Sequence, residues 1–394
     1  MSNNRPSKRA AIVSLFSNIV SSSSFVASTC LDNHDERLST VRTTYLSTSG
    51  TIPPVDRCFW RMIDNDLTDE REFMHFIAFS RSSFNKLVQI CTDHLDSHPI
   101  RPSRGNTTHD KPSSCHLAKR KHSNRDIIAM TIKYMISTSE IKNLSPQFGA
   151  TNCAYSDLVN FGKETILKCL IHHSDAMVFW DQSLENLKYH PSRTKAFQDC
   201  ESVVAFIDGL MINSLNDKDP VAQNGDYNNW KSDCFRKYIL IWDTEGRCVD
   251  CGVNLPGSYH DSKCASVTNI YEHIAALPDG FVVVADSAFN TTHKSLEGKV
   301  VKAKFSIFHR DDKYSREELV SERDSQLTSL RQAAEWGNKD LRNTFRRLKM
   351  KLKTDNNERA LLLWTALLLH NYKLSTCVVN QTRTYFNIIV DDYN

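Results

Sequence analysis

Two apolar runs, each ending in an aspartate, constrain the fold of this chain more than any other feature. Val-Val-Ala-Phe-Ile (203–207) leads directly into Asp208, and Phe-Val-Val-Val-Ala (281–285) leads into Asp286. Runs of this length, rich in β-branched and aromatic residues, are typical of strands buried on both faces. An unpaired charge inside such a strand is costly. We therefore expect each aspartate to lie at the carboxyl end of its strand, facing a cation or solvent.

The elements around the two runs predict a mixed α/β domain. A hairpin turn at Asp243–Gly246, with glycine in the left-handed position, joins two further strands. The expected elements are strands at 203–207, 236–242, 248–253, 281–285 and 299–305, a helix at 263–277, and a long helix from Ser315. This is the order of an α/β ribonuclease H-like fold, a mixed five-stranded sheet of order 3-2-1-4-5 flanked by helices. Its first and fourth strands are neighbours, so Asp208 and Asp286 should lie side by side.

A third acid is expected on the long helix. Beside the apolar stripe of that helix runs a row at helical spacing, formed by Arg331, Glu335, Lys339, Arg342, Arg346 and Lys349. Glu335 is the only acid in the row, and exposed pairing at about 0.2–0.5 kcal/mol for each pair can account for it. The two strand-end aspartates that precede Glu335 in the sequence favour a role for it as a metal ligand instead. Hard cations such as Mg²⁺ or Mn²⁺ take oxygen ligands, and a third carboxylate would complete the site.

Five short motifs resemble the PIF/Harbinger transposases, in particular their fungal forms. They are Phe-Ile-Asp-Gly-Leu (206–210), Pro-Gly-Ser-Tyr-His-Asp-Ser (256–262), Val-Ala-Asp-Ser-Ala-Phe (284–289), Arg-Gln-Ala-Ala-Glu-Trp-Gly (331–337) and Leu-His-Asn (369–371). The resemblance extends over about residues 58–390 and is most specific after 200. The chain departs from the family pattern at Met211–Asn213 and at Asn338–Asp340.

The resemblance implies a DDE-superfamily endonuclease that cuts and joins phosphodiester bonds at transposon ends. The metal-binding and catalytic triad would be Asp208, Asp286 and Glu335, the same acids indicated by the strand ends and the helix. Two Mg²⁺ or Mn²⁺ ions would be the cofactor. The expected partners are DNA, a separate Myb-like protein and further copies of the chain, and the expected location is the nucleus. The alternative is a domesticated, catalytically silent DNA-binding protein of the same fold, for which intact carboxylates would not be required.

The cations near Glu335 are expected to bind DNA phosphates, although a solvated helix face is the alternative. They are Arg331, Lys339, Arg342, Arg346, Arg347 and Lys349. The family resemblance also indicates His260 and Asp261 as accessory residues near the site. For Asp261, capping of the helix that follows is the preferred interpretation.

Three cysteines and a histidine have a spacing that zinc sites use. Cys248, Cys251, His260 and Cys264 form a C-x2-C-x8-H-x3-C set. Strand alternation would send Cys248 and Cys251 to opposite faces, which argues against shared ligation. A structural zinc is therefore not expected.

The chain before residue 201 is expected to be largely helical and to contact DNA. The predicted segments are a disordered leader at 1–57, a helical segment at 58–100, a basic linker at 101–124, a helix-turn-helix-like region at 125–200, the nuclease domain at 201–375 and a tail at 376–394. The third helix of the helix-turn-helix would present Asn152, Ser156, Asn160 and Lys163 to a DNA groove. A three-helix unit packed without DNA contact is the alternative. Residues 1–31, which lack acids, fit either a cleaved leader or a polar tail.

Composition adds limits on partners and compartment. Lysine plus arginine (49) barely exceeds aspartate plus glutamate (46), so the total charge indicates no particular partner. Local charge is stronger, because residues 101–125 carry seven cations and one acid. Twelve cysteines without a framework spacing favour a reducing compartment. No apolar stretch approaches the ~20 residues that cross a bilayer, so no membrane association is expected.

Overall fold

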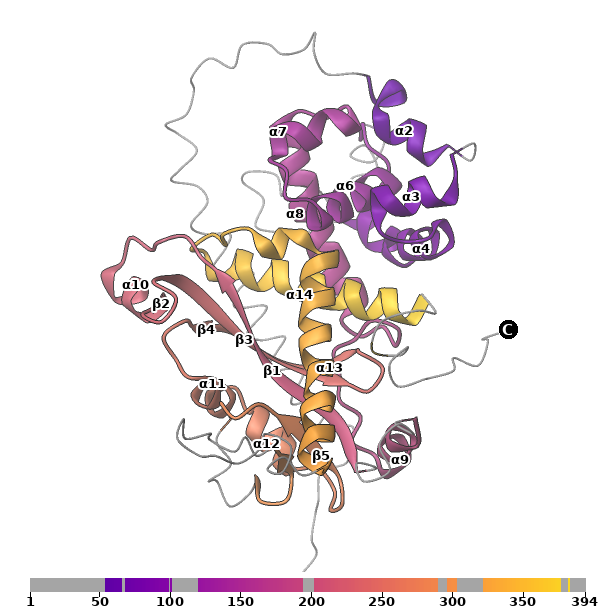
Figure 1. Cartoon of the computed structure of the whole chain (residues 1–394). Helices are drawn as coiled ribbons and strands as arrows, with labels where there is room; N and C mark the ends of the chain where they lie inside the picture. The colour runs from indigo at the N-terminus through magenta and orange to yellow at the C-terminus, as the bar shows by residue number, and fades with distance from the viewer. Residues whose placement is uncertain are drawn as a thin grey trace, which may run out of the picture.

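The computed structural model places a helical bundle beside a mixed sheet (Figure 1). It describes residues 54–65, 68–98, 100, 120–193, 202–289, 296–302, 322–376 and 382. Most of the predicted leader, linker and tail lie outside these residues, as do the expected start of the long helix at Ser315 and the end of the strand predicted at 299–305. Within the described part of the chain, no helix combines the length and apolar character that a membrane span requires.

The sheet is built around β1 (Val203–Asn213). This strand pairs antiparallel with β3 (Asp233–Asp243) and parallel with β5 (Val282–Ala285). On the outer sides, β4 (Cys248–Pro256) pairs with β3, and β6 (Val300–Val301) pairs with β5. The predicted contact between the first and fourth expected strands is therefore present as the β1–β5 pair.

The predicted number of five strands is wrong. A sixth strand, β2 (Tyr227–Asn228), also pairs with β3, so the strand order differs from the prediction by this addition. It follows the short helix α10 (Pro220–Asp226). Two residues are too few to leave an alternating apolar pattern, and the pattern is what sequence-based assignment of strands depends on.

The expectation that Asp208 ends its strand is also wrong. β1 continues to Asn213, and Asp208 lies opposite Leu240 in the antiparallel pair with β3. The parallel partner β5 does end there, since the last pair in that register joins Ile207 to Ala285. Asp208 and Asp286 therefore both follow the last residue pair of β1 and β5.

Helices cover both faces of the sheet. One face packs against α13 (Glu322–Thr344) and α14 (Asn356–Thr376). The other packs against α9 (Leu184–Arg193), α11 (Asp261–Val267) and α12 (Ile270–Ala275). The helix predicted at 263–277 is thus two helices, because Asn269 adopts a left-handed conformation (φ 59°) between them.

The bundle contains the helices expected before residue 201. They are α2 (Phe59–Asp64), α3 (Glu70–Ile77), α4 (Arg81–Ser97), α6 (Asn124–Ile136), α7 (Ile141–Leu144), the short 3₁₀ helix η3 (Ser145–Phe148) and α8 (Asn152–Leu170). Gly149 in the left-handed conformation (φ 63°) closes η3 and turns the chain toward α8. α8 lies between α4, α6 and α14, so much of its surface is covered by other helices.

Helix α14 joins the bundle to the sheet. Its Tyr372 hydroxyl donates a hydrogen bond to the Ser83 carbonyl of α4. The Asn371 side chain accepts a hydrogen bond from the backbone N–H of Cys248 in β4, and it donates hydrogen bonds to the carbonyls of Cys248 and Met177. One apolar core contains residues from the bundle, the sheet, α13 and α14. The Leu-His-Asn motif at 369–371 therefore has a structural role between the two regions.

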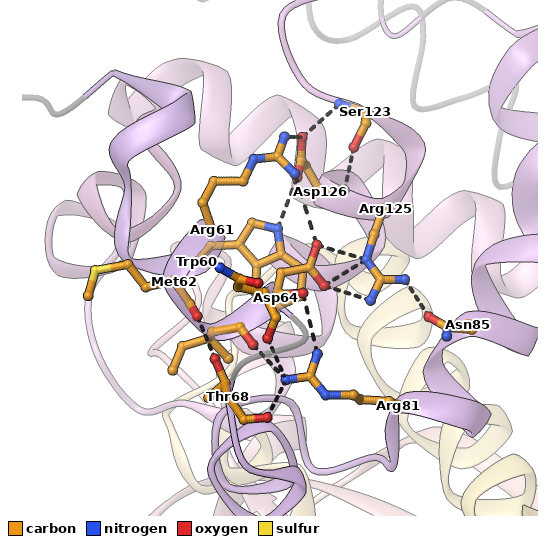
Figure 2. A network of polar contacts seen from close by, with 12 residues as sticks. Trp60, Arg61, Met62, Asp64, Thr68, Arg81, Asn85, Ser123, Arg125 and Asp126 are labelled. Carbon is orange, nitrogen blue, oxygen red and sulfur yellow. Dashed lines mark hydrogen bonds and ion pairs between the residues drawn. The ribbon is translucent and has the colours of Figure 1, made fainter.

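A buried carboxylate organises the bundle (Figure 2). Asp126 is 1% exposed and accepts hydrogen bonds from the Trp60 indole, the Arg61 guanidinium and the Ser123 backbone. Ser123 in turn caps α6, and the two residues form a capping box. This network connects the start of α6 to α2, which lies more than 60 residues earlier in the chain.

Replacing Asp126 by alanine is expected to destabilise the protein by about 2–3 kcal/mol. The change removes the Asp126 half of the capping box and leaves the buried Trp60 N–H without its partner. Urea unfolding of wild type and variant measures the difference. The control is Glu140→Ala, which removes an exposed ion pair with Lys142 and should change stability by less than about 0.5 kcal/mol. Equal effects of the two changes would contradict a special role for Asp126.

Candidate active site

The two strand-linked aspartates form the centre of the candidate site. Asp208 follows the last β1–β5 residue pair, and Asp286 is the first residue after β5. The Asp208 carboxylate accepts a hydrogen bond from the backbone N–H of the next residue, Gly209, at 2.8 Å. The Asp286 carboxylate accepts the N–H and the hydroxyl of Ser287. Parallel pairing thus brings together two acids that are 78 residues apart in sequence.

Glu335 reaches the same region from α13. An arginine connects it to one of the aspartates, since Arg331 lies 3.0 Å from the Glu335 carboxylate and 3.7 Å from that of Asp286. The pairing expected on the helix surface is therefore present, and it includes one of the strand aspartates. Glu335 and Asp286 therefore share the Arg331 guanidinium, and the charges of both acids act on Asp208.

The electrostatics of Asp208 also indicate this convergence. Burial is the main cause that raises the pKa of Asp208 from 3.8 to about 7, and the Gly209 N–H opposes the rise. The negative charges of Glu335, Asp261 and Asp286 raise it further. A carboxyl whose charge is disfavoured by burial and by other carboxylates is typical of functional sites.

Asn338 is a site residue that the sequence analysis missed. Its side-chain N–H donates to the Asp208 carboxylate at 2.8 Å, and its carbonyl oxygen accepts the Trp242 indole N–H at 3.2 Å. Gly337 permits this approach, because a Cβ there would lie 2.5 Å from the Trp242 ring. The departure from the family pattern at 338 thus supplies a residue that orients Asp208. The sequence alone does not reveal this contact, because it depends on the rotation of α13, which the fit of Gly337 against Trp242 determines.

Replacing Asn338 by alanine is expected to lower the metal-dependent DNA cleavage that the motif resemblance implies by about 10–100-fold, since partners that orient metal-binding carboxylates typically have effects of this size. The metal concentration for half-maximal cleavage should also rise, which loss of fold alone would not cause. The control on the same helix is Asn343→Ala, whose side chain only accepts a hydrogen bond from Lys349 at the surface. An unchanged metal requirement in Asn338→Ala would count against the orienting role.

Asp261 lies beside the site, whereas His260 points to solvent. The Asp261 carboxylate would be 2.8 Å from a Cβ at Gly209, so glycine is needed there. It forms an ion pair with the largely buried Lys237 at 2.8 Å. The expected capping role is wrong, because His260 occupies the N-cap position of α11. His260 is exposed and its ring contacts Ser262.

The four residues with zinc-like spacing are divided between two sides of the sheet. A register shift in the β3–β4 pair places Cys248 and Cys251 against the same apolar cluster, so the expectation of opposite faces is wrong. Cys264 belongs to the cluster on the other face, and His260 is exposed. This separation does not support a shared zinc site.

The predicted phosphate-binding cations have different surroundings. Lys339, Arg346 and Lys349 are exposed and Arg342 is half-buried, which keeps them available to DNA. Arg331 pairs with the site acids. Arg347 packs over the Tyr134 ring at 4.0 Å and donates to the carbonyls of Tyr134 and Ser139. The Arg347 guanidinium is therefore held by α6, and its role in phosphate binding stays a prediction.

The predicted DNA-binding residues of α8 do not share one solvent-facing side. Asn152 and Asn160 are exposed and Ser156 is partly exposed, and Asn152 also accepts a hydrogen bond from Ser145. Lys163 is 5% exposed, so its assignment to the polar side is wrong. The cause is packing by elements remote in sequence, since α14 and the segment before it cover this end of α8.

The donor chemistry of the site fits a divalent cation. Its acids supply only oxygen ligands, which Mg²⁺ and Mn²⁺ prefer, and their mutual repulsion is relieved by positive charge. In this structure the Arg331 guanidinium supplies that charge. Among the described residues, no three His, Cys, Asp or Glu side chains are close enough to hold a metal ion as they stand. Metal binding at these acids would therefore require Arg331 and the carboxylates to adjust.

Comparison with known proteins gives a family match over the segment that carries these acids. Residues 207–371 match the family model described as DDE superfamily endonuclease. The matched segment includes Asp208, Asp286 and Glu335 and covers somewhat less than half of the chain. It supports a nuclease domain of the DDE transposase type and does not single out the PIF/Harbinger branch. No curated protein and no solved structure gives a significant match.

Proposed function

We propose that this chain is a metal-dependent DNA endonuclease of the transposase type, with Asp208, Asp286 and Glu335 as its metal-binding triad. The observation that carries the proposal is the placement of two aspartates at the end of the β1–β5 pair, with Glu335 on the facing helix. The DDE superfamily endonuclease match over the same segment supports it. The substrate would be DNA, and the bond attacked would be a phosphodiester.

The residues of the site have distinct roles in this proposal. Two divalent ions, when bound, would activate an oxygen nucleophile and stabilise the departing 3′ oxygen. Asp208, the most buried of the triad, would hold both ions, while Asp286 and Glu335 would each hold one. Asn338 would orient the Asp208 carboxylate through its 2.8 Å hydrogen bond. Lys237 would restrain Asp261 beside the site.

The finer assignment rests on the motif resemblance. We propose a PIF/Harbinger-type transposase acting on the inverted repeats of a transposon in the nucleus, as a homo-oligomer and with a Myb-like partner protein. The exposed cations Lys339, Arg346 and Lys349 would contact DNA phosphates beyond the triad. Asn152, Ser156 and Asn160 of α8 would remain candidates for DNA contact.

A second candidate is a catalytically silent DNA-binding protein. The pairing of Arg331 with Glu335 and Asp286 favours it, because the arginine neutralises these acids without metal. Incubation of the purified protein with supercoiled plasmid that carries the DNA flanking its coding sequence distinguishes the two. The nuclease predicts nicking with Mg²⁺ or Mn²⁺ and none with EDTA. Retention of DNA in a gel shift without cleavage under any metal condition would indicate the silent protein.

A further inference from the structure

A basic hollow lies between the bundle and the segment that connects α13 to α14. Its volume is about 60 Å³, which is room for about four water molecules. This size suits a phosphate group. The charged residues that line it are Lys163, Arg347, Lys351, Lys353, Glu358 and Arg359. Five cations thus face one acid in a confined space.

Most of these cations already have partners. Lys353 pairs with Glu358 at 2.8 Å, and Lys351 pairs with Asp233 at 3.1 Å. Arg347 donates to two carbonyls of the α6 region. Glu358, the only acid among the described residues that line the hollow, is therefore already paired with Lys353. No second acid in the described part of the chain lines the hollow to pair with the two remaining cations, Lys163 and Arg359.

The two remaining cations are both buried. Arg359 is 2% exposed, and its Nε and Nη1 groups are buried with no hydrogen-bond partner among the described residues. Its other nitrogen donates to Asn356, and the Arg236–Asp226 pair lies in its electrostatic neighbourhood. Lys163 is 5% exposed and makes no hydrogen bond or ion pair to the described residues. Its closest aromatic contact is the Tyr134 ring, 5.7 Å away.

Such an arrangement is costly unless an anion fills it. Burial of polar and charged groups without partners is unfavourable. Burial is the main cause that lowers the pKa of Lys163 to about 8, and the charges of Lys353 and Arg347 lower it too, against Glu358 and Glu164. An anion in the hollow would favour the charged form of Lys163 and supply acceptors to Arg359.

We propose that this hollow is a phosphate-binding site, separate from the triad, built by Lys163, Arg359 and the cations around them. The ligand would be a phosphate group, either from the backbone of bound DNA or from a free phosphate ion. The assignment to DNA rests on the proposed function, which this site would deepen. Leu352 at its edge bridges to Ser214, directly after β1. Ser214 is six residues beyond Asp208, about 20 Å along an extended strand. The phosphate held here would therefore not be the one that reacts.

The test uses Lys163→Met in the full chain, which removes the charge and conserves the length of the side chain. Inorganic phosphate should raise the melting temperature of wild type and should have little effect on the variant. For DNA, the slope of log K against log salt should fall by about 0.9 in the variant, the value for one lost phosphate contact. Lys86→Met, at an exposed lysine paired with Asp175, is the matched control and should change neither result.

The outcomes separate the ligand sources. Loss of the phosphate effect with an unchanged DNA slope supports the site with free phosphate as its ligand, and a reduced slope supports a DNA phosphate. If Lys163→Met changes neither, the proposal is overturned. Lys351→Met at the exposed rim provides the same readouts should Lys163→Met fail to fold. Both readouts are independent of cleavage, so a wild-type protein that binds phosphate and cuts no DNA contradicts only the nuclease assignment.

Discussion

Replacing Asp208 by asparagine is expected to reduce metal-dependent DNA cleavage at least about 10³-fold. Bound metal ions contribute several kcal/mol to stabilisation of the transition state, and about 4 kcal/mol corresponds to three powers of ten in rate. Asparagine conserves the shape of the side chain and can still accept the hydrogen bond from Asn338, but it removes the negative charge that binds metal. Single-turnover cleavage of plasmid DNA with Mg²⁺ measures the change.

The control for this experiment is Asp279→Asn. Asp279 is fully exposed at the turn before β5 and pairs only at the surface, with Lys299. Its replacement should leave the cleavage rate within a factor of two or so, because exposed ion pairs contribute little. Wild-type cleavage by the Asp208 variant would exclude Asp208 as a metal ligand, and the nuclease assignment of this site would fail with it.

The same Asp208→Asn change is expected to stabilise the metal-free protein at pH 8, by up to about 4 kcal/mol. The folded state raises the pKa of Asp208 from 3.8 to about 7, chiefly by burial and also through Glu335, Asp261 and Asp286. A raised pKa means that the protonated form favours folding. The contribution of Asp208 to stability is full below about pH 4 and is lost as the pH rises through about 7. An asparagine at position 208 carries no charge at any pH, so the variant does not lose stability as the pH rises through about 7.

Urea unfolding in EDTA at pH 5 and at pH 8 tests this prediction. The variant should be more stable than wild type at pH 8, and the difference should shrink at pH 5, where Asp208 is largely protonated. Asp279→Asn should show no such pH-dependent difference. If the Asp208 variant has the same advantage at both pH values, or none, the pKa of Asp208 is not raised by folding as inferred. A change that removes activity and raises stability is the expected behaviour of a site that concentrates like charges.

The parts of the site that could be predicted from sequence are those set by local pattern. Two apolar runs ending in acids indicated the β1–β5 pair, because buried strands have a recognisable length and composition. The same pattern misplaced the end of β1, since the antiparallel partner β3 extends past Asp208 and supports five more residues. Glu335 was identifiable as the only acid in a cationic helical row, and its pairing with Arg331 followed from i, i+4 spacing.

The parts that could not be predicted depend on contacts between distant elements. Lys163 reads as a surface residue on its own helix, and only packing against the region of α14, about 190 residues later, buries it. Arg347 belongs to a basic run by sequence, but the Tyr134 ring of α6 covers it. The contact of Asn338 with Asp208 depends on how α13 is rotated, which the fit of Gly337 against Trp242 determines.

The position of α14 has a consequence for engineering. Tyr372 holds α4 and Asn371 holds β4 from the same turn of this helix, so the bundle and the sheet are not interchangeable modules. A chimera that takes residues 54–193 from another protein would place a foreign surface against α14 and lose these bonds. Grafting a new DNA preference onto this chain would therefore require transplanting α14 together with the bundle helices, although α14 and the bundle lie at opposite ends of the described chain.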